Sequence, residues 1–147
     1  MAGATILVLN GPNLNLLGVR EPATYGRETL ADIEEACLER AADLNLAVDF
    51  RQSNHEGQLV DWIQEARETA DGIVINAAAL THYGWSLHDA LAAFDGKVVE
   101  VHLSNPFARE PWRHTSVVTP VADGCISGFG GLGYDLAIEA VARMLDA

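Results

Sequence analysis

Short apolar runs alternate along the chain with segments in which apolar residues recur at helical spacing. The runs, and one stretch of alternating apolar and polar residues, predict strands at 6–9, 48–51, 72–75 and 97–102. The helical spacing predicts helices at 30–44, around 59–66, at 85–94 and at 134–145. Residues 117–126 are interrupted by Pro120 and Gly124 and are expected to hold a short fifth strand.

This alternation of strand and helix within 147 residues predicts one α/β domain that spans residues 1–147. Right-handed crossovers between parallel strands place helices on both faces of the sheet, which gives three layers. For five strands, the expected fold is flavodoxin-like, a doubly wound parallel sheet with the order 2-1-3-4-5. Ligands then bind outside the carboxyl ends of the first and third strands, where the winding direction reverses.

Polar and loop residues follow the strands whose ends should meet at this crevice. Since neighbouring parallel strands have their carboxyl ends at one edge of the sheet, we expect these residues to converge. The residues concerned form three segments: 10–13, then Asn76 with residues 77–82, and then 102–105.

The connection after the first strand is unusually long. About fifteen residues precede the next helical pattern, against roughly two to six in an ordinary strand-to-helix connection, and long loops of this kind often cover a ligand. Gly18 and Gly26 supply bends or hinges. We interpret residues 17–27 as a lid loop that carries Arg20 near Tyr25.

A tyrosine near an arginine suggests base catalysis. Tyrosine side chains have an ordinary pKa of about 10, so they remove protons at neutral pH only where positive charge stabilises the phenolate. Arg20 is the candidate for that charge, and Tyr25 would then take a proton from a carbon next to a carbonyl group. His102 is the candidate acid, because Glu100 lies two residues earlier on the same strand face and can orient it. Each residue also has an ordinary structural explanation, and their convergence at one crevice favours catalysis.

The charge distribution indicates a small anionic ligand. A net charge of −12 argues against nucleic acid or an anionic membrane as partner, because lysine and arginine drive such binding. Asn13 and Asn76 offer neutral donors for an enolate or a carboxylate. Four arginines of this acidic chain fall in the two crevice loops: Arg20, Arg27, Arg109 and Arg113.

The motifs indicate neither a cofactor nor a metal. GFGGLG at 128–133 matches a dinucleotide-binding pattern, but it precedes the last helix instead of following the first strand, so close packing explains it better. The histidine and carboxylate residues match no zinc-site spacing. Cys37 and Cys125 show no CxxC spacing, and each is expected to be a small buried residue. Because no targeting segment is recognisable, we expect the cytoplasm as location.

Four long motifs cover most of the chain: LNGPNLNLLGVREPATYG, DGIVINAAALTHYGWSLHDAL, VVEVHLSNPFAREPWRHTS and GCISGFGGLGYDLAIEA. In these motifs the chain closely resembles the type II 3-dehydroquinate dehydratases. The resemblance implies the flavodoxin-like fold and a cofactor-free hydro-lyase of the shikimate pathway or of quinate breakdown. It implies dehydration of 3-dehydroquinate to 3-dehydroshikimate by anti elimination through an enolate.

The resemblance also implies catalytic roles. Tyr25 matches the family's base, and Arg20 matches the arginine that stabilises the charged states. His102 matches the acid that protonates the departing hydroxyl group, and Glu100 matches its partner. Asn13 matches the residue that supports the enolate through water.

Further positions match the family's substrate-binding residues and its assembly. The substrate-binding positions are Asn76, His82, Leu103, Ser104 and Arg113. Asp89 matches an aspartate that reaches the site from a neighbouring subunit, and such enzymes are typically dodecamers built from four trimers. Ala77 and Tyr83-Gly84-Trp85 depart from the commoner family pattern, in the pocket wall and at the expected subunit contact.

Two other functions stay open from the residues alone. A flavodoxin-like module would bind FMN or another phosphate ligand in the first loop, although residues 11–17 lack the serines and threonines of such loops. An assembly protein without chemistry would give no enone absorbance with dehydroquinate.

Overall fold

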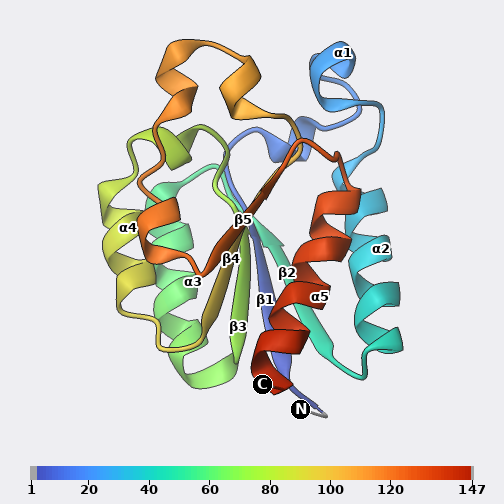
Figure 1. The fold of residues 1–147 in the computed structure, drawn as a ribbon, viewed down its shortest axis with the longest axis vertical. Coiled ribbons are helices and arrows are strands. Elements are labelled where there is room, and N and C mark those ends of the chain that lie inside the picture. Colours follow the sequence, from blue (N-terminus) through green and yellow to red (C-terminus); the bar gives the residue numbers. More distant parts are fainter. Residues whose placement is uncertain (1–2, 147) are drawn as a thin grey trace.

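The computed structural model describes residues 3–146 as a five-stranded parallel sheet between two layers of helices (Figure 1). The strand order β2-β1-β3-β4-β5 confirms the predicted flavodoxin-like topology. The strands are β1 (Thr5–Asn10), β2 (Ala47–Gln52), β3 (Gly72–Asn76), β4 (Lys97–His102) and β5 (Gly124–Ser127). The helices are α1 (Pro22–Tyr25), α2 (Leu30–Asp43), α3 (Glu56–Thr69), α4 (Trp85–Ala92) and α5 (Leu132–Asp146). No helix within residues 3–146 is both long and apolar enough to cross a membrane.

Both faces of the sheet are covered, which explains why the central strands β1 and β3 are almost entirely apolar. In β1, Leu7 and Leu9 pack in the layer with α3 and α4, whereas Ile6 and Val8 pack in the layer with α2 and α5. Neighbouring residues of a strand point to opposite faces, so a strand buried on both sides needs an unbroken apolar run. Thr29 and Asp32 form a capping box at the start of α2.

The lid differs from the predicted irregular loop. It contains the one-turn helix α1, which sequence periodicity could not reveal because four residues are too few to show a helical repeat. Pro22 opens this turn, where its fixed φ angle suits a helix and its missing N–H is not needed. In Figure 1, α1 and the orange segment after β4 lie at the same end of the molecule.

A buried tyrosine ties together the ends of the two strands at the predicted crevice. The Tyr134 hydroxyl donates to Asn10 Oδ1 at 2.7 Å and accepts from Asn76 Nδ2 at 3.0 Å. Burial raises the pKa of Tyr134, so this hydroxyl stays neutral. Asn76 Oδ1 in turn accepts from the backbone N–H of Ala78 at 3.1 Å. The amide of Asn76 therefore has a fixed orientation at the edge of the sheet.

Gly11 brings the loops after β1 and β3 into direct contact. Its N–H donates to the Asn76 carbonyl at 2.8 Å, and an added Cβ would come within 2.5 Å of the Ala77 carbonyl oxygen. Gly11→Ala is therefore expected to lower the free energy of unfolding by about 1–3 kcal/mol, as measured by urea denaturation. Gly57→Ala in α3 is the control, because its Cβ would meet nothing within 4 Å. Equal stability of the two variants would contradict the close contact.

Candidate active site

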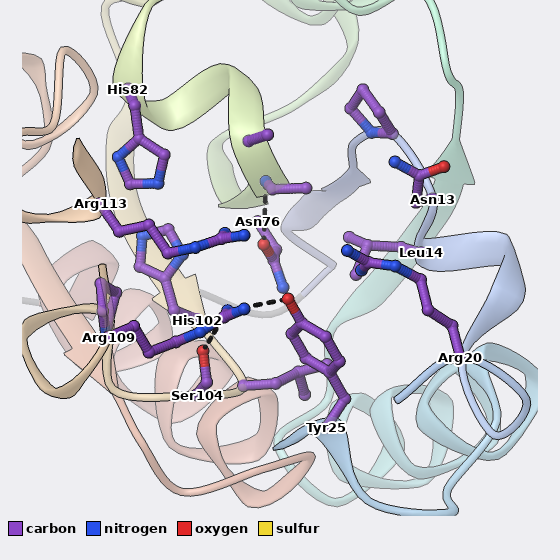
Figure 2. Close-up of a pocket in the computed structure, with 15 residues that line it drawn as sticks. Asn13, Leu14, Arg20, Tyr25, Asn76, His82, His102, Ser104, Arg109 and Arg113 are labelled. Atoms are coloured by element: carbon purple, nitrogen blue, oxygen red, sulfur yellow. Dashed lines mark hydrogen bonds between the residues drawn. The ribbon is translucent and has the colours of Figure 1, made fainter. Parts of the chain in front are cut away.

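A pocket opens at the carboxyl edge of the sheet, beyond the ends of β1, β3 and β4 (Figure 2). Since the lid and the segment after β4 form its walls, it lies at the crevice that the strand order predicts. Of the four arginines in the two crevice loops, Arg109 lines the pocket, whereas Arg27 is exposed and is not among the lining residues. Among the predicted site residues, those that line it are Asn13, Arg20, Tyr25, Asn76, His82, His102, Leu103, Ser104 and Arg113.

Arg109 is the functional residue that sequence reasoning left out of the candidate site. Its Nη1 donates to the Tyr25 hydroxyl at 2.8 Å and lies 3.3 Å from the Ser104 hydroxyl oxygen (Figure 2). A guanidinium that donates to a phenol oxygen stabilises the phenolate, because the positive charge and the hydrogen bond both favour the anion. The cluster of arginines in the crevice loops was recognisable from the sequence. Which of them reaches the tyrosine required the geometry.

Arg20 contributes charge to the same ring from another direction. Its Cζ atom lies 5.1 Å from the centre of the Tyr25 ring, the same distance as that of Arg109. Its Nη2 lies 3.2 Å from a carboxylate oxygen of Glu21. Two guanidinium groups thus flank one phenol, and the hydrogen bond to its hydroxyl comes from Arg109.

His102 and Glu100 form the predicted pair at the end of β4. His102 Nε2 lies 2.6 Å from Glu100 Oε2. Since an ionised carboxylate only accepts, Nε2 carries the proton of this bond, and Nδ1 is the other ring nitrogen that can exchange protons. Glu100 is 1% exposed and lies behind His102, which itself lines the pocket.

Two hydroxyl groups hold the buried carboxylate. Ser116 donates to Glu100 Oε2 at 3.0 Å and Thr119 donates to Oε1 at 2.5 Å. Burial alone would raise the pKa of Glu100, but the hydrogen bonds from His102 and from these hydroxyls outweigh it and hold the pKa below its ordinary value. Glu100 is therefore ionised near neutral pH and stabilises a protonated imidazole beside it.

His82 presents an acceptor to the pocket. Its Nδ1 lies 2.7 Å from the Thr115 carbonyl oxygen, which can only accept, so Nδ1 carries a proton. Burial lowers the pKa of His82, which favours the neutral ring with an unprotonated Nε2. Arg113 lines the same part of the pocket. Its Cζ atom lies 4.1 Å from the centre of the Trp112 ring, and its Nε donates to Glu110 Oε2 at 3.1 Å. These two contacts fix the orientation of the guanidinium group.

The remaining lining residues are set by backbone geometry. Asn13 has a φ angle of 70°, in the left-handed region that asparagine tolerates better than most residues. Its N–H donates to Asn54 Oδ1 at 3.0 Å, which anchors the loop after β1. Leu103 and Ser104 follow directly on β4, so the strand itself determines their place in the pocket.

Two sequence predictions concern residues outside this pocket. Asp89 is exposed on α4, in a hollow lined also by Val60 and Arg67, and it does not reach the pocket of its own chain. The prediction that both cysteines are buried is right for Cys37 and wrong for Cys125. Cys125 lies on β5, the last strand of the sheet, where no further strand covers it.

Comparison with known proteins places the chain among enzymes with the same fold. Residues 4–142 match the family model described as Dehydroquinase class II. The chain is 60% identical over 143 residues to a 3-dehydroquinate dehydratase 2 from Pseudomonas aeruginosa, covering 97% of each chain. The type II dehydroquinase from Butyrivibrio crossotus has a TM-score of 0.93 and 47% identity over 95% of this chain and 97% of that chain. The type II dehydroquinase from Propionibacterium acnes has the same TM-score and is 42% identical, and the match covers 97% of this chain and 98% of that chain. The chain belongs to the class II dehydroquinase family.

Proposed function

We propose that this protein dehydrates 3-dehydroquinate to 3-dehydroshikimate, with Tyr25 as base and His102 as acid. The observation that carries the proposal is the placement of two charge-supported pairs in one pocket. Tyr25 bonds Arg109, and His102 bonds Glu100. The names of the relatives support the choice of substrate, because they are 3-dehydroquinate dehydratases and type II dehydroquinases.

The first step is removal of a proton from the carbon next to the substrate ketone. The Tyr25 phenolate takes this proton, and the electron pair of the C–H bond moves onto the ketone to form an enolate. Arg109 and Arg20 stabilise the phenolate before the step. Asn13 supports the enolate through a water molecule, which spreads the new negative charge over donors in the pocket.

The second step is loss of the hydroxyl group on the opposite face. His102 gives a proton to the departing oxygen as the enolate electrons form the new carbon–carbon double bond, so water leaves and the ketone returns. Glu100 stabilises the charged imidazole that precedes this transfer and fixes its orientation. Tyr25 and His102 exchange their proton states during the turnover, and solvent restores them.

The other lining residues suit a small polyhydroxy acid. Arg113 supplies positive charge for the carboxylate side of the ligand, and the neutral His82 supplies an acceptor for a hydroxyl group. Further hydrogen bonds to the substrate come from the side chains of Asn76 and Ser104 and from the backbone N–H groups of Leu103 and Ser104. This set needs neither a metal nor an organic cofactor for the elimination.

Residues 17–27 act in this proposal as a lid of a single catalytic domain, residues 1–147. Gly18 and Gly26 have φ angles of 89° and 84°, which a residue with a side chain rarely adopts, so they suit hinge positions. Because α1 carries Tyr25 between these glycines, closing the lid delivers the base and excludes water together.

We further propose that the protein acts in the cytoplasm as a dodecamer of four trimers. The exposed position of Asp89 suits a residue that completes the pocket of a neighbouring subunit. The reaction serves the shikimate pathway and aromatic amino acid synthesis, or quinate breakdown.

Ultraviolet absorbance tests the function directly, because the product contains a conjugated enone and the substrate does not. Adding 3-dehydroquinate to the purified protein is expected to give a steady rise in absorbance without added metal or cofactor. The same rate after treatment with EDTA is expected. A flat signal would refute the proposed reaction.

Glu100→Gln tests the acid half of the site. Glutamine keeps the size of the side chain and one of its two acceptor oxygens, so it can accept from Ser116 or from Thr119 but not from both. It also removes the charge that stabilises the imidazolium. We expect kcat to fall about 100-fold, near the lower end of what acid–base catalysis contributes. Glu139→Gln on α5, a partly exposed residue paired with Arg40 and Arg143, is the control and should keep its activity. Equal rates for both variants would show that Glu100 plays no part in the reaction.

A further inference from the structure

Metal-binding side chains from two neighbouring strands share one face of the sheet. The parallel register places Glu100 of β4 opposite Cys125 of β5, and His102 opposite Ser127. Since residues two apart along a strand point to the same side, these four side chains form a two-by-two array. Cys125 and Ser127 have no part in the proposed dehydration.

Three of these side chains already bring their donor atoms together. One ligand atom each from Glu100, His102 and Cys125 lie within 4.8 Å of one another. The Cys125 sulfur also lies 3.5 Å from the Ser127 hydroxyl. Donors in a tetrahedral zinc site, with bonds of about 2.0–2.3 Å, stand about 3.3–3.8 Å apart. Glu100 Oε2 and His102 Nε2 now lie 2.6 Å apart. A modest lengthening of this distance, together with a rotation of the Cys125 thiol, would meet the geometry of such a site.

The cluster is anchored on one side and open on the other. Glu100 is held by Ser116 and Thr119 and keeps its negative charge in a buried position. Cys125 is exposed, so an ion can reach the array from solvent. A thiolate, an imidazole and a carboxylate favour zinc or cadmium, whereas magnesium and calcium prefer oxygen ligands.

We propose that Glu100, His102 and Cys125 form an inhibitory site for a thiophilic divalent cation, such as zinc or cadmium. On binding, the cation displaces the thiol proton of Cys125 and, from the imidazolium form of His102, the Nε2 proton shared with Glu100. Both protons pass to solvent, and Nδ1 keeps its proton, so the bound ring is neutral. The ion then holds the imidazole ring and the carboxylate that stabilises its charged form. His102 can no longer be recharged as an acid, so dehydration stops. This inhibition rests on the proposed role of His102, whereas binding of the ion does not.

Cadmium is the probe, because cadmium–thiolate bonds absorb in the ultraviolet and report binding without an activity assay. The chain has two cysteines, and Cys37 lies in α2, in the apolar layer on the other side of the sheet. Cys37→Ala is therefore the matched control for Cys125→Ala. We expect the band in the wild-type protein and in Cys37→Ala, at one cadmium per chain, and no band in Cys125→Ala.

Inhibition is measured on the same three proteins by the enone absorbance assay. Without cadmium, Cys125→Ala should be as active as the wild-type protein. The cadmium concentration for half inhibition should rise at least about tenfold in Cys125→Ala, because even the loss of a contact supporting a ligand weakens metal affinity this much. Adding EDTA should restore wild-type activity.

The two readouts separate the possible failures. A thiolate band that persists in Cys125→Ala, or equal cadmium sensitivity of the two variants, would overturn the site. A Cys125-dependent band without inhibition would overturn the capture of His102. If the cadmium-free protein does not dehydrate 3-dehydroquinate at all, the proposed function fails, and the band alone then decides whether the site exists.

Discussion

Tyr25→Phe is expected to lower kcat by about 10²–10⁴-fold, the range that a positioned base contributes. Phenylalanine keeps the ring, so the contacts of Arg20 and Arg109 with its face are retained and only the reactive oxygen is lost. Binding of the product, measured by calorimetry, should therefore change little. This combination of lost turnover and retained binding is the signature of a group that acts on the reacting proton.

Tyr83→Phe provides the matched control for this change. Tyr83 is 61% exposed and does not line the pocket, so the same chemical change there should leave kcat unaltered. Activity of Tyr25→Phe within about tenfold of the wild type would contradict its role as base, because even a modest base contributes about 10²-fold.

Arg109→Ala is expected to have the second largest effect, a fall in kcat of about 10²–10³-fold, because fewer molecules then carry the phenolate that acts as the base and an adjacent opposite charge shifts such an ionisation by up to about three powers of ten. The variant removes the hydrogen bond of 2.8 Å to the Tyr25 hydroxyl and half of the positive charge near the ring. Arg20 is not expected to replace this bond, because it approaches from another direction and also pairs with Glu21.

Arg27→Ala is the appropriate comparison for Arg109→Ala. Arg27 lies at the end of the same lid and is exposed, outside the residues that line the pocket. Steady-state kinetics of the two variants separate a contact with Tyr25 from a general loss of positive charge. Similar losses of kcat in both would show that the loss of positive charge anywhere in the two crevice loops is sufficient, and would contradict a specific role for Arg109.

The sequence predicted the fold well because the relevant signals are local and redundant. β1 and β3 are unbroken apolar runs, and the Thr29 capping box marks the start of α2. Once the strand order followed from the alternation of strand and helix, Asn76 and His102 had to lie at the same edge of the sheet.

Contacts between segments far apart in the sequence could not be predicted in the same way. Arg109 and Tyr25 are 84 residues apart, and their hydrogen bond depends on the path of two irregular loops. Tyr134 was expected only to begin the last helix, yet its hydroxyl joins β1 to β3. Cys125 was misjudged because burial of a short residue depends on whether its strand lies at the edge of the sheet.

Hydrogen exchange in heavy water is the most direct test that Tyr25 acts as the base and His102 as the acid. In His102→Gln, Tyr25 can still form the enolate, but the hydroxyl group cannot leave, so the enolate returns to substrate with a solvent deuteron. Nuclear magnetic resonance should therefore show deuterium entering 3-dehydroquinate beside the ketone, without product, and no exchange above the buffer rate in Tyr25→Phe. Exchange in Tyr25→Phe as fast as in His102→Gln would contradict the assignment of Tyr25 as the base.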